Sequence, residues 1–149
     1  MKGGGMMTNF YKQIVVAVDF SEASKLAFER AAAIAAAYDA TLTIVSVIDD
    51  RSAASVATYD KKYIDELTIE YNEKLDRAKE KAASLGVSDV RVLIEVGSPK
   101  KILTSFDDAD LIVCGATGLN AAERLFIGSI SESIVRKAAC DVLIVRVKA

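Results

Sequence analysis

Five short runs of apolar, mainly β-branched residues recur along the chain, and they limit the possible folds more than any other feature. The runs are QIVVAV (Gln13–Val18), TLTIVSVI (Thr41–Ile48), VRVLIEV (Val90–Val96), DLIVCG (Asp110–Gly115) and VLIVRV (Val142–Val147). Runs that stay largely apolar, instead of alternating strictly with polar residues, are typical of strands covered on both faces of a parallel sheet. The sequence therefore predicts five buried parallel strands.

Two helices are predicted before the third run. Ser21 can cap a helix that extends to about Tyr38, and Asp39 closes it. A longer helix carries one apolar stripe with members three or four residues apart, and Gly86 is its expected C-terminal stop. The stripe consists of Ile64, Leu67, Tyr71, Leu75, Ala78, Ala82 and Leu85. The small and polar segment from Asp49 to Tyr59 is expected to be a surface loop.

Two further helices complete an alternation of strands and helices. Ser98 and Pro99 begin a short helix that ends near Phe106, and the last helix begins near Ser129. The alternation predicts a single α/β domain with right-handed crossovers and helices on both faces of the sheet. In such sheets ligands bind beyond the carboxyl ends of the strands, where the strand order reverses.

The composition excludes several classes of chemistry. The 149 residues include no histidine, which removes Ser-His-Asp catalysis and imidazole metal sites. Basic and acidic residues are interspersed and give a net charge of −2, so nucleic acid is not an expected partner. Cys114 and Cys140 lie beside apolar runs without CxxC spacing. We expect reduced thiols rather than a disulfide, which indicates a cytoplasmic protein.

Neither a leader peptide nor a membrane span is predicted. Residues 1–10 lack the apolar stretch of a signal peptide, so we expect a flexible N-terminal tail before one domain at residues 11–149. The helical run LAFERAAAIAAAY contains charges and is shorter than a membrane span. No membrane partner is expected.

The stretch GATGLNAAERLFIGS, Gly115 to Ser129, follows the fourth run and has the spacing G-x2-G-x9-G-S. It matches neither GxGxxG nor GxxxxGK[ST]. The physical principle is nevertheless shared with those loops. Glycines let amide N–H groups approach an anion closely, and a helix N-terminus adds partial positive charge. The stretch therefore predicts a backbone that faces phosphate.

This stretch, followed by SESIVRKAACDVLIVRV, resembles the ATP-binding branch of the universal stress protein family, and IVVAVDFSE is similar to that family's first strand and turn. The resemblance extends from Lys12 to Val147. It implies a Rossmann-like sheet, as in the adenine nucleotide alpha hydrolases, with strand order 3-2-1-4-5 and its reversal between the first and fourth strands. The chain departs from the family pattern in its short segment from Pro99 to Asp108 and in Asp141, which stands where proline is common.

The resemblance also implies which residues hold an adenine nucleotide. Asp19 would accept a hydrogen bond from a ribose hydroxyl, and the backbone of Val47 would contact the adenine. The full set near adenine and ribose is Ala17, Val18, Asp19, Val47, Cys114 and Gly115. The set near the phosphates, which would act through amides and hydroxyls, is Gly118, Gly128, Ser129, Ile130 and Ser131.

The implied function is an ATP-binding, or AMP- or ADP-binding, protein of stress response or signalling whose nucleotide occupancy is the signal. The family's last strand often pairs with a second copy, so residues 142–147 would be a homodimer edge. A slow ATPase, which Arg124 could assist, and an interaction module that works without nucleotide stay open as alternatives. Asp49 and Asp50 could hold Mg²⁺ beside a triphosphate, or be solvated loop acids.

Each site residue also has an interpretation that needs no ligand. Ser129 and Glu132 form an S-x-x-E pattern, which is a capping box. Gly115 and Gly118 could simply form a turn, and Asp19 could cap the first helix. Cys114 is better explained as a small buried side chain than as a redox switch.

Overall fold

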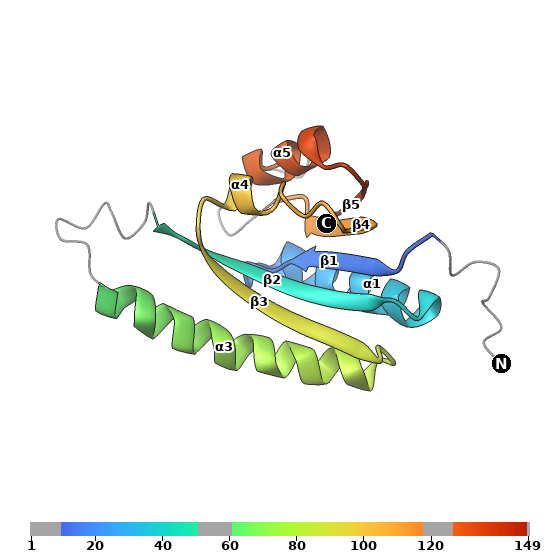
Figure 1. The fold of residues 1–149 in the computed structure, drawn as a ribbon, viewed down its shortest axis with the longest axis horizontal. Helices are drawn as coiled ribbons and strands as arrows, with labels where there is room; N and C mark the ends of the chain where they lie inside the picture. The colour runs from blue at the N-terminus through green and yellow to red at the C-terminus, as the bar shows by residue number, and fades with distance from the viewer. Residues whose placement is uncertain (1–9, 51–60, 118–126, 149) are drawn as a thin grey trace.

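The computed structural model describes residues 10–50, 61–117 and 127–148. Its centre is one sheet of parallel strands, shown in Figure 1, in the order β3-β2-β1-β4-β5. The strands are β1 (Gln13–Ala17), β2 (Thr41–Asp49), β3 (Asp89–Gly97), β4 (Leu111–Gly115) and β5 (Asp141–Val145). The predicted number, direction and order of the strands are confirmed, and most strand ends differ by one or two residues from the expected ones.

The order of the sheet reverses at β1, which lies between β2 and β4. The β1–β2 pairing runs from Gln13↔Thr41 to Ala17↔Val45, while β2 continues to Asp49 alongside β3. On the other side, β1 pairs with β4 through Ile14↔Leu111 to Val16↔Val113. The carboxyl ends of β1 and β4 therefore form the switch point where doubly wound sheets bind ligands.

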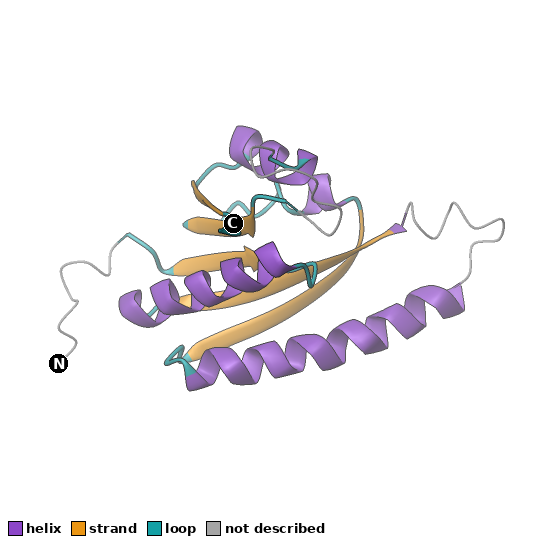
Figure 2. Cartoon of the chain, turned by 180° about the vertical axis from the view of Figure 1, so that it is seen from behind, coloured by secondary structure: helices purple, strands orange, loops and turns teal. Residues whose placement is uncertain are grey.

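Helices cover both faces of the sheet, as the alternation predicts. Helices α1 (Glu22–Tyr38) and α3 (Lys61–Ser84) lie on one face, and α4 (Pro99–Ile102) and α5 (Ser129–Lys137) lie on the other. Figure 2, which views the chain from behind, shows α1 in front of the strands, with α3 running along the outer strand β3.

Two cores lie on opposite faces of the sheet because successive strand residues point to opposite sides. Ile14, Val16 and Leu42 face α1 and α3, and fully buried alanines of α1 let that helix approach the strands closely. Val15 and Ile112 face the other side and pack in one cluster with Ile134 of α5. Apolar side chains thus point both ways from β1 and β4, which explains why these runs do not alternate.

The ends of the long helices follow the predicted local chemistry. Ser21 is the N-cap of α1, and Asp39 ends that helix in the left-handed conformation with φ 55°. Gly86, with φ 103°, follows α3. One position in the predicted apolar stripe is wrong, because Leu85 is 46% exposed. It lies after Ser84, the last residue of α3, and so is no longer aligned with the helix face.

Helix α4 is shorter than the sequence predicts and ends at Ile102 rather than near Phe106. The hydroxyls of Thr104 and Ser105 donate to backbone carbonyls that would accept amide hydrogen bonds in a longer helix. Thr104 Oγ1 donates to the Lys100 carbonyl at 2.6 Å, and Ser105 Oγ donates to the Ile102 carbonyl at 2.7 Å. Such local hydroxyl bonds compete with helix propagation.

The two cysteines are free, with Cys114 buried and Cys140 partly buried, as the absence of CxxC spacing indicates. Among the described residues, no helix combines the length and the apolarity that a membrane span requires.

Candidate functional site

The structure brings most of the predicted site residues that it describes to the ends of β1 and β4. Ser131 Oγ on α5 donates to the Gly115 carbonyl at 2.6 Å, and the Gly128 amide donates to the Ala116 carbonyl at 2.7 Å. These two bonds fix the start of α5 against the end of β4. Gly118, which the glycine spacing places nearest the phosphates, lies outside the described residues.

The turn after β1 presents the carboxylate of Asp19. Asp19 Oδ1 accepts from the amide of Ser21 at 3.0 Å and also from its hydroxyl, and the Asp19 amide donates to Ser24 Oγ at 3.3 Å. Ser21 Oγ in turn accepts from the Ser24 amide and caps α1. The alternative that Asp19 caps α1 is therefore wrong. Its side chain is exposed, and only one of its oxygens takes these bonds.

The backbone of Val18 is fixed on both sides. Its amide donates to the Val45 carbonyl at 2.8 Å, and its carbonyl accepts from Ser46 Oγ at 2.7 Å. Ser46 is 1% exposed, so its hydroxyl has to find a partner inside the protein. Ser46 is not among the residues predicted for the site. The sequence shows a serine within a largely buried strand, but it does not show that this hydroxyl bonds to Val18.

Val47 lies on β2 beyond the point where β1 ends. The N–H and C=O of a strand residue point to the same side, and that side alternates along the strand. The carbonyl of Val45 points toward β1, so the N–H and C=O of Val47 point the same way. The β1 pairing stops at Ala17↔Val45, and the Val18 carbonyl accepts from Ser46 instead. Val47 thus turns one donor and one acceptor toward the switch point.

Helix α5 begins without a side-chain cap. Its N-cap is Gly128, and Ser129 is its first helical residue. The first amide that bonds back within the helix is that of Glu132, which donates to the Gly128 carbonyl at 2.9 Å. The amides of Ser129, Ile130 and Ser131 precede it and have no intrahelical acceptor, as at any helix start. They are the donors that suit an anion.

The capping-box alternative for Ser129 is wrong. Because Ser129 lies inside the helix rather than at the cap, its side chain makes no capping bond. Glu132 is accordingly one residue beyond the position a capping box requires. Its carboxylate pairs instead with Arg136, at 2.8 Å, one turn along the helix.

Gly115 and Gly128, the two glycines of the stretch that the structure describes, differ in how much room their surroundings leave for a side chain. A Cβ on Gly115 would lie 2.7 Å from the Ala23 Cβ and 2.9 Å from its carbonyl carbon, so α1 packs directly on this backbone. Among the described residues, a Cβ on Gly128 would lie 3.5 Å from the Ala116 carbonyl oxygen and 3.7 Å from the Thr117 Cα, which are ordinary contact distances. Gly128 has φ −63°, which any residue adopts. Among the described residues, packing therefore does not require glycine at position 128, as it does at position 115.

Cys114 lies behind this surface and is 4% exposed. Burial raises the pKa of its thiol to about 11, although a hydrogen bond with Ser131 acts in the opposite direction. A thiol with this pKa stays protonated near neutral pH. It is therefore inert as a nucleophile and serves as a small apolar side chain.

Metal ligands do not gather in the described part of the site. No group of three or more His, Cys, Asp or Glu side chains lies together within residues 10–50, 61–117 and 127–148. Asp49 is the last residue of β2 and is partly buried, and Asp50 beside it is exposed.

Comparison with known proteins gives a consistent result over almost the whole chain. The Universal stress protein family model matches residues 10–146. A relative from Staphylococcus aureus (strain USA300), which carries the universal stress protein name, is 48% identical over 140 residues, covering 91% of this chain and 84% of its own.

Solved structures show the same architecture. The protein MJ0577 superposes with a TM-score of 0.84 at 26% identity, over 94% of this chain and 99% of its own. A universal stress protein solved in complex with cAMP has a TM-score of 0.68 at 29% identity, over 93% of this chain and 98% of its own.

Proposed function

Because this chain belongs to the universal stress protein family, we propose that it binds an adenine nucleotide at the β1–β4 switch point and acts in stress response or signalling through the occupancy of that site. The observation that carries the proposal is the uncapped start of α5, held against the end of β4, with a glycine at its N-cap that packing among the described residues does not require. Amides at a helix start, with glycine in front of them, are suited to phosphate.

The other end of the site supports adenine as the base. Val47 offers an N–H and a C=O on one side of β2, which match the N1 acceptor and the N6 amino donor of adenine. Guanine presents a donor at N1 and an acceptor at O6, so the same backbone pair would meet it with both polarities reversed. A related protein has been solved with cAMP, which carries adenine.

The ribose would lie between these two ends. Asp19 is exposed and is oriented by Ser21, so its carboxylate can accept a hydrogen bond from a ribose hydroxyl. Ala17, Val18 and Gly115 would form the surface beneath the sugar, with Cys114 behind them. We propose ATP as the ligand, with AMP and ADP as alternatives that share these contacts. If Mg²⁺ accompanies a triphosphate, phosphate oxygens would supply ligands, and Asp49 or Asp50 would add a carboxylate.

The test is isothermal titration of the purified protein with ATP, AMP, cAMP and GTP. We expect the adenine nucleotides to bind in preference to GTP. Gly128→Val should weaken ATP binding at least about tenfold, because a branched side chain would occupy the phosphate space. Mass spectrometry of small molecules released from freshly denatured protein would identify a carried nucleotide. The proposal is wrong if no adenine nucleotide binds at millimolar concentration.

A further inference from the structure

Phe20 holds a backbone conformation that its side chain disfavours. It lies in the turn between β1 and α1 and has φ 66°. Among the described non-glycine residues only Phe20 and Asp39 have positive φ. Aspartate tolerates this region, whereas a bulky aromatic residue rarely occupies it. Such strain persists only where the surroundings hold it, and it is concentrated at functional sites.

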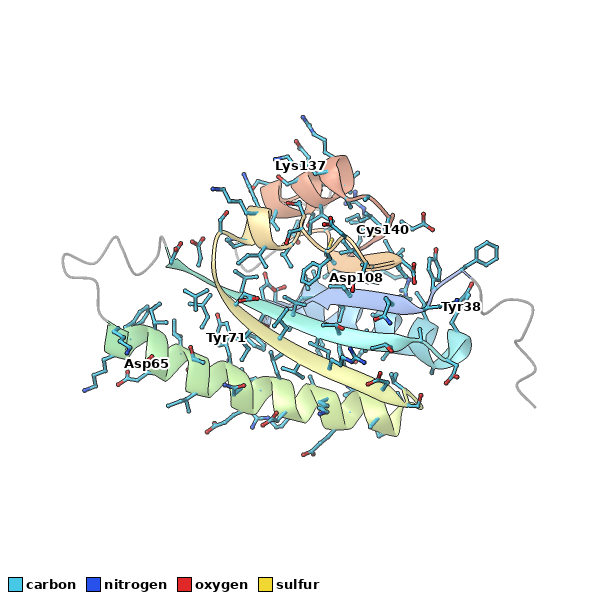
Figure 3. The ribbon with its side chains drawn as sticks, in the orientation of Figure 1. Tyr38, Asp65, Tyr71, Asp108, Lys137 and Cys140 are labelled. Carbon is cyan, nitrogen blue, oxygen red and sulfur yellow. The ribbon has the colours of Figure 1, made fainter. Side chains whose placement is uncertain are left out.

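Two side chains of α3 contact the Phe20 ring, which also packs against the core on that face of the sheet. The Phe20 ring meets the Tyr71 ring edge-on, with centroids 4.9 Å apart and an interplanar angle of 77°. Lys74, one turn further along α3, places its Nζ 4.6 Å from the centre of the same ring. Both contacts are of attractive types. Tyr71 itself packs against the cluster of Ile48 and Ile64, and Figure 3 shows it between α3 and the strands.

The anchored ring lies between the two residues whose hydrogen bonds orient the site. Asp19 precedes Phe20, Ser21 follows it, and the Ser21 amide and hydroxyl donate to the Asp19 carboxylate. The ring contacts with α3 oppose relaxation of this strained turn to negative φ. That relaxation would turn the Asp19 carboxylate away from its present direction.

We propose that Phe20 is a positioning residue. Its contacts with α3 fix the turn that carries Asp19, and the packing of α3 is therefore coupled to nucleotide occupancy. The inference rests on the proposed function, because it takes Asp19 as the ribose ligand. Coupling between sites is reciprocal. Nucleotide binding should therefore stabilise the part of α3 around Tyr71 and Lys74, and loosening α3 should weaken nucleotide binding.

The first experiment measures ATP affinity by titration for variants on both sides of the contact. Phe20→Leu and Tyr71→Leu should each lower the affinity about three- to tenfold, since an aromatic pair contributes on that scale. Phe20→Tyr keeps the ring and should restore near-normal affinity. Tyr63→Leu, which truncates an exposed tyrosine of the same helix, is the matched control and should leave the affinity unchanged.

The contribution of the lysine is tested by charge removal on α3. Lys74→Gln should lower ATP affinity, whereas Lys79→Gln, at an exposed position of the same helix, should not. Circular dichroism confirms that each variant is folded at the titration temperature. Because Lys74→Gln changes no core side chain, it keeps the inference testable if Phe20→Leu fails to fold.

Two further measurements separate positioning from general destabilisation. In an Asp19→Ala background, Phe20→Leu should cause no additional loss of affinity, because both changes act through the same carboxylate. Hydrogen exchange should show that ATP protects α3 amides around Tyr71 in the wild type and not in Phe20→Leu. If the wild type binds no adenine nucleotide, the proposed function and this inference both fail. If it binds ATP but Phe20→Leu binds equally well, or ATP leaves α3 exchange unchanged, only this inference fails.

Discussion

Gly115 and Gly128 belong to one motif, but the first is required by packing and the second by the proposed ligand. We expect Gly115→Ala to lower the free energy of unfolding by about 1–3 kcal/mol, because the added carbon would press on the Ala23 backbone and force β4 and α1 apart. Gly128→Ala should cost less than about 1 kcal/mol, the scale of a less suitable N-cap. Urea denaturation followed by circular dichroism measures both.

The same pair of variants separates stability from binding. Gly128→Ala should reduce ATP affinity in a protein of nearly normal stability, since the proposed complex places phosphate against the Gly128 backbone and the amides of Ser129 and Ile130, where an added Cβ would crowd it. The opposite pattern, with a stable Gly115→Ala and a strongly destabilised Gly128→Ala, would contradict the packing described for the end of β4.

Individual residues also mark the limit of what the sequence could predict. The carboxylate of Asp19 and the glycine spacing were recognisable because their chemistry is local to the motif. The role of Ser46 depends on the carbonyl of Val18, which follows β1, and the role of Phe20 depends on side chains of α3. Residue type gives no indication of either contact. A positive φ at a phenylalanine is contrary to its ordinary preference, so no propensity argument would have predicted it.

At the scale of elements, Tyr11 joins the approach to β1 with the start of β5. Its hydroxyl donates to Asp141 Oδ2 at 2.8 Å, and its ring lies edge-on against Tyr38 with centroids 5.1 Å apart. Asp141 stands where the family commonly has proline, and this bond gives the aspartate a structural role. We expect a double-mutant cycle of Tyr11→Phe and Asp141→Ala to give a coupling of about 0.5–1 kcal/mol, the scale of a partly exposed hydrogen bond.

The pH dependence of this coupling follows from the raised pKa of Tyr11. The hydrogen bond to Asp141 raises that pKa above its ordinary value of 10.0, because it requires the protonated phenol. The coupling should therefore be fully present below pH 10 and be lost as the pH rises through the pKa of the folded state. Tyr11→Phe keeps the ring on Tyr38 and so isolates the hydroxyl. A coupling that persists well above this range would contradict the assignment.

Element boundaries could be predicted where local chemistry alone decides them. Ser21, Asp39 and Gly86 end or begin helices as their preferences require. The start of α5 was predicted at the correct residue, but with the wrong cap. The S-x-x-E pattern makes Ser129 a suitable cap, whereas the bond from Ser131 to the Gly115 carbonyl places Ser129 inside the helix. The N-cap of α5 therefore depends on contacts between distant segments, which the local sequence pattern does not contain.

For the whole molecule, the apolar runs alone predict a parallel sheet with helices on both faces. They do not give the order of the strands, which came from the family resemblance and which the structure confirms. That order places the ends of β1 and β4 side by side, at the position where doubly wound sheets bind ligands. It also leaves β3 and β5 as the two edges of the sheet, of which β3 is flanked by α3.

We propose that the β5 edge pairs with a second copy of the chain, and backbone direction gives a sharp test. The Val145 carbonyl accepts from Ala116 beside β4, so the alternate residues Val142 and Ile144 turn their N–H and C=O groups outward. Val142→Pro would remove one outward donor and spare the β4 ladder, whereas Val142→Ala retains that donor. Light scattering should give twice the chain mass for the wild type and Val142→Ala, and less for a folded Val142→Pro. A monomeric wild type, or an equally stable dimer of Val142→Pro, would exclude pairing through this edge.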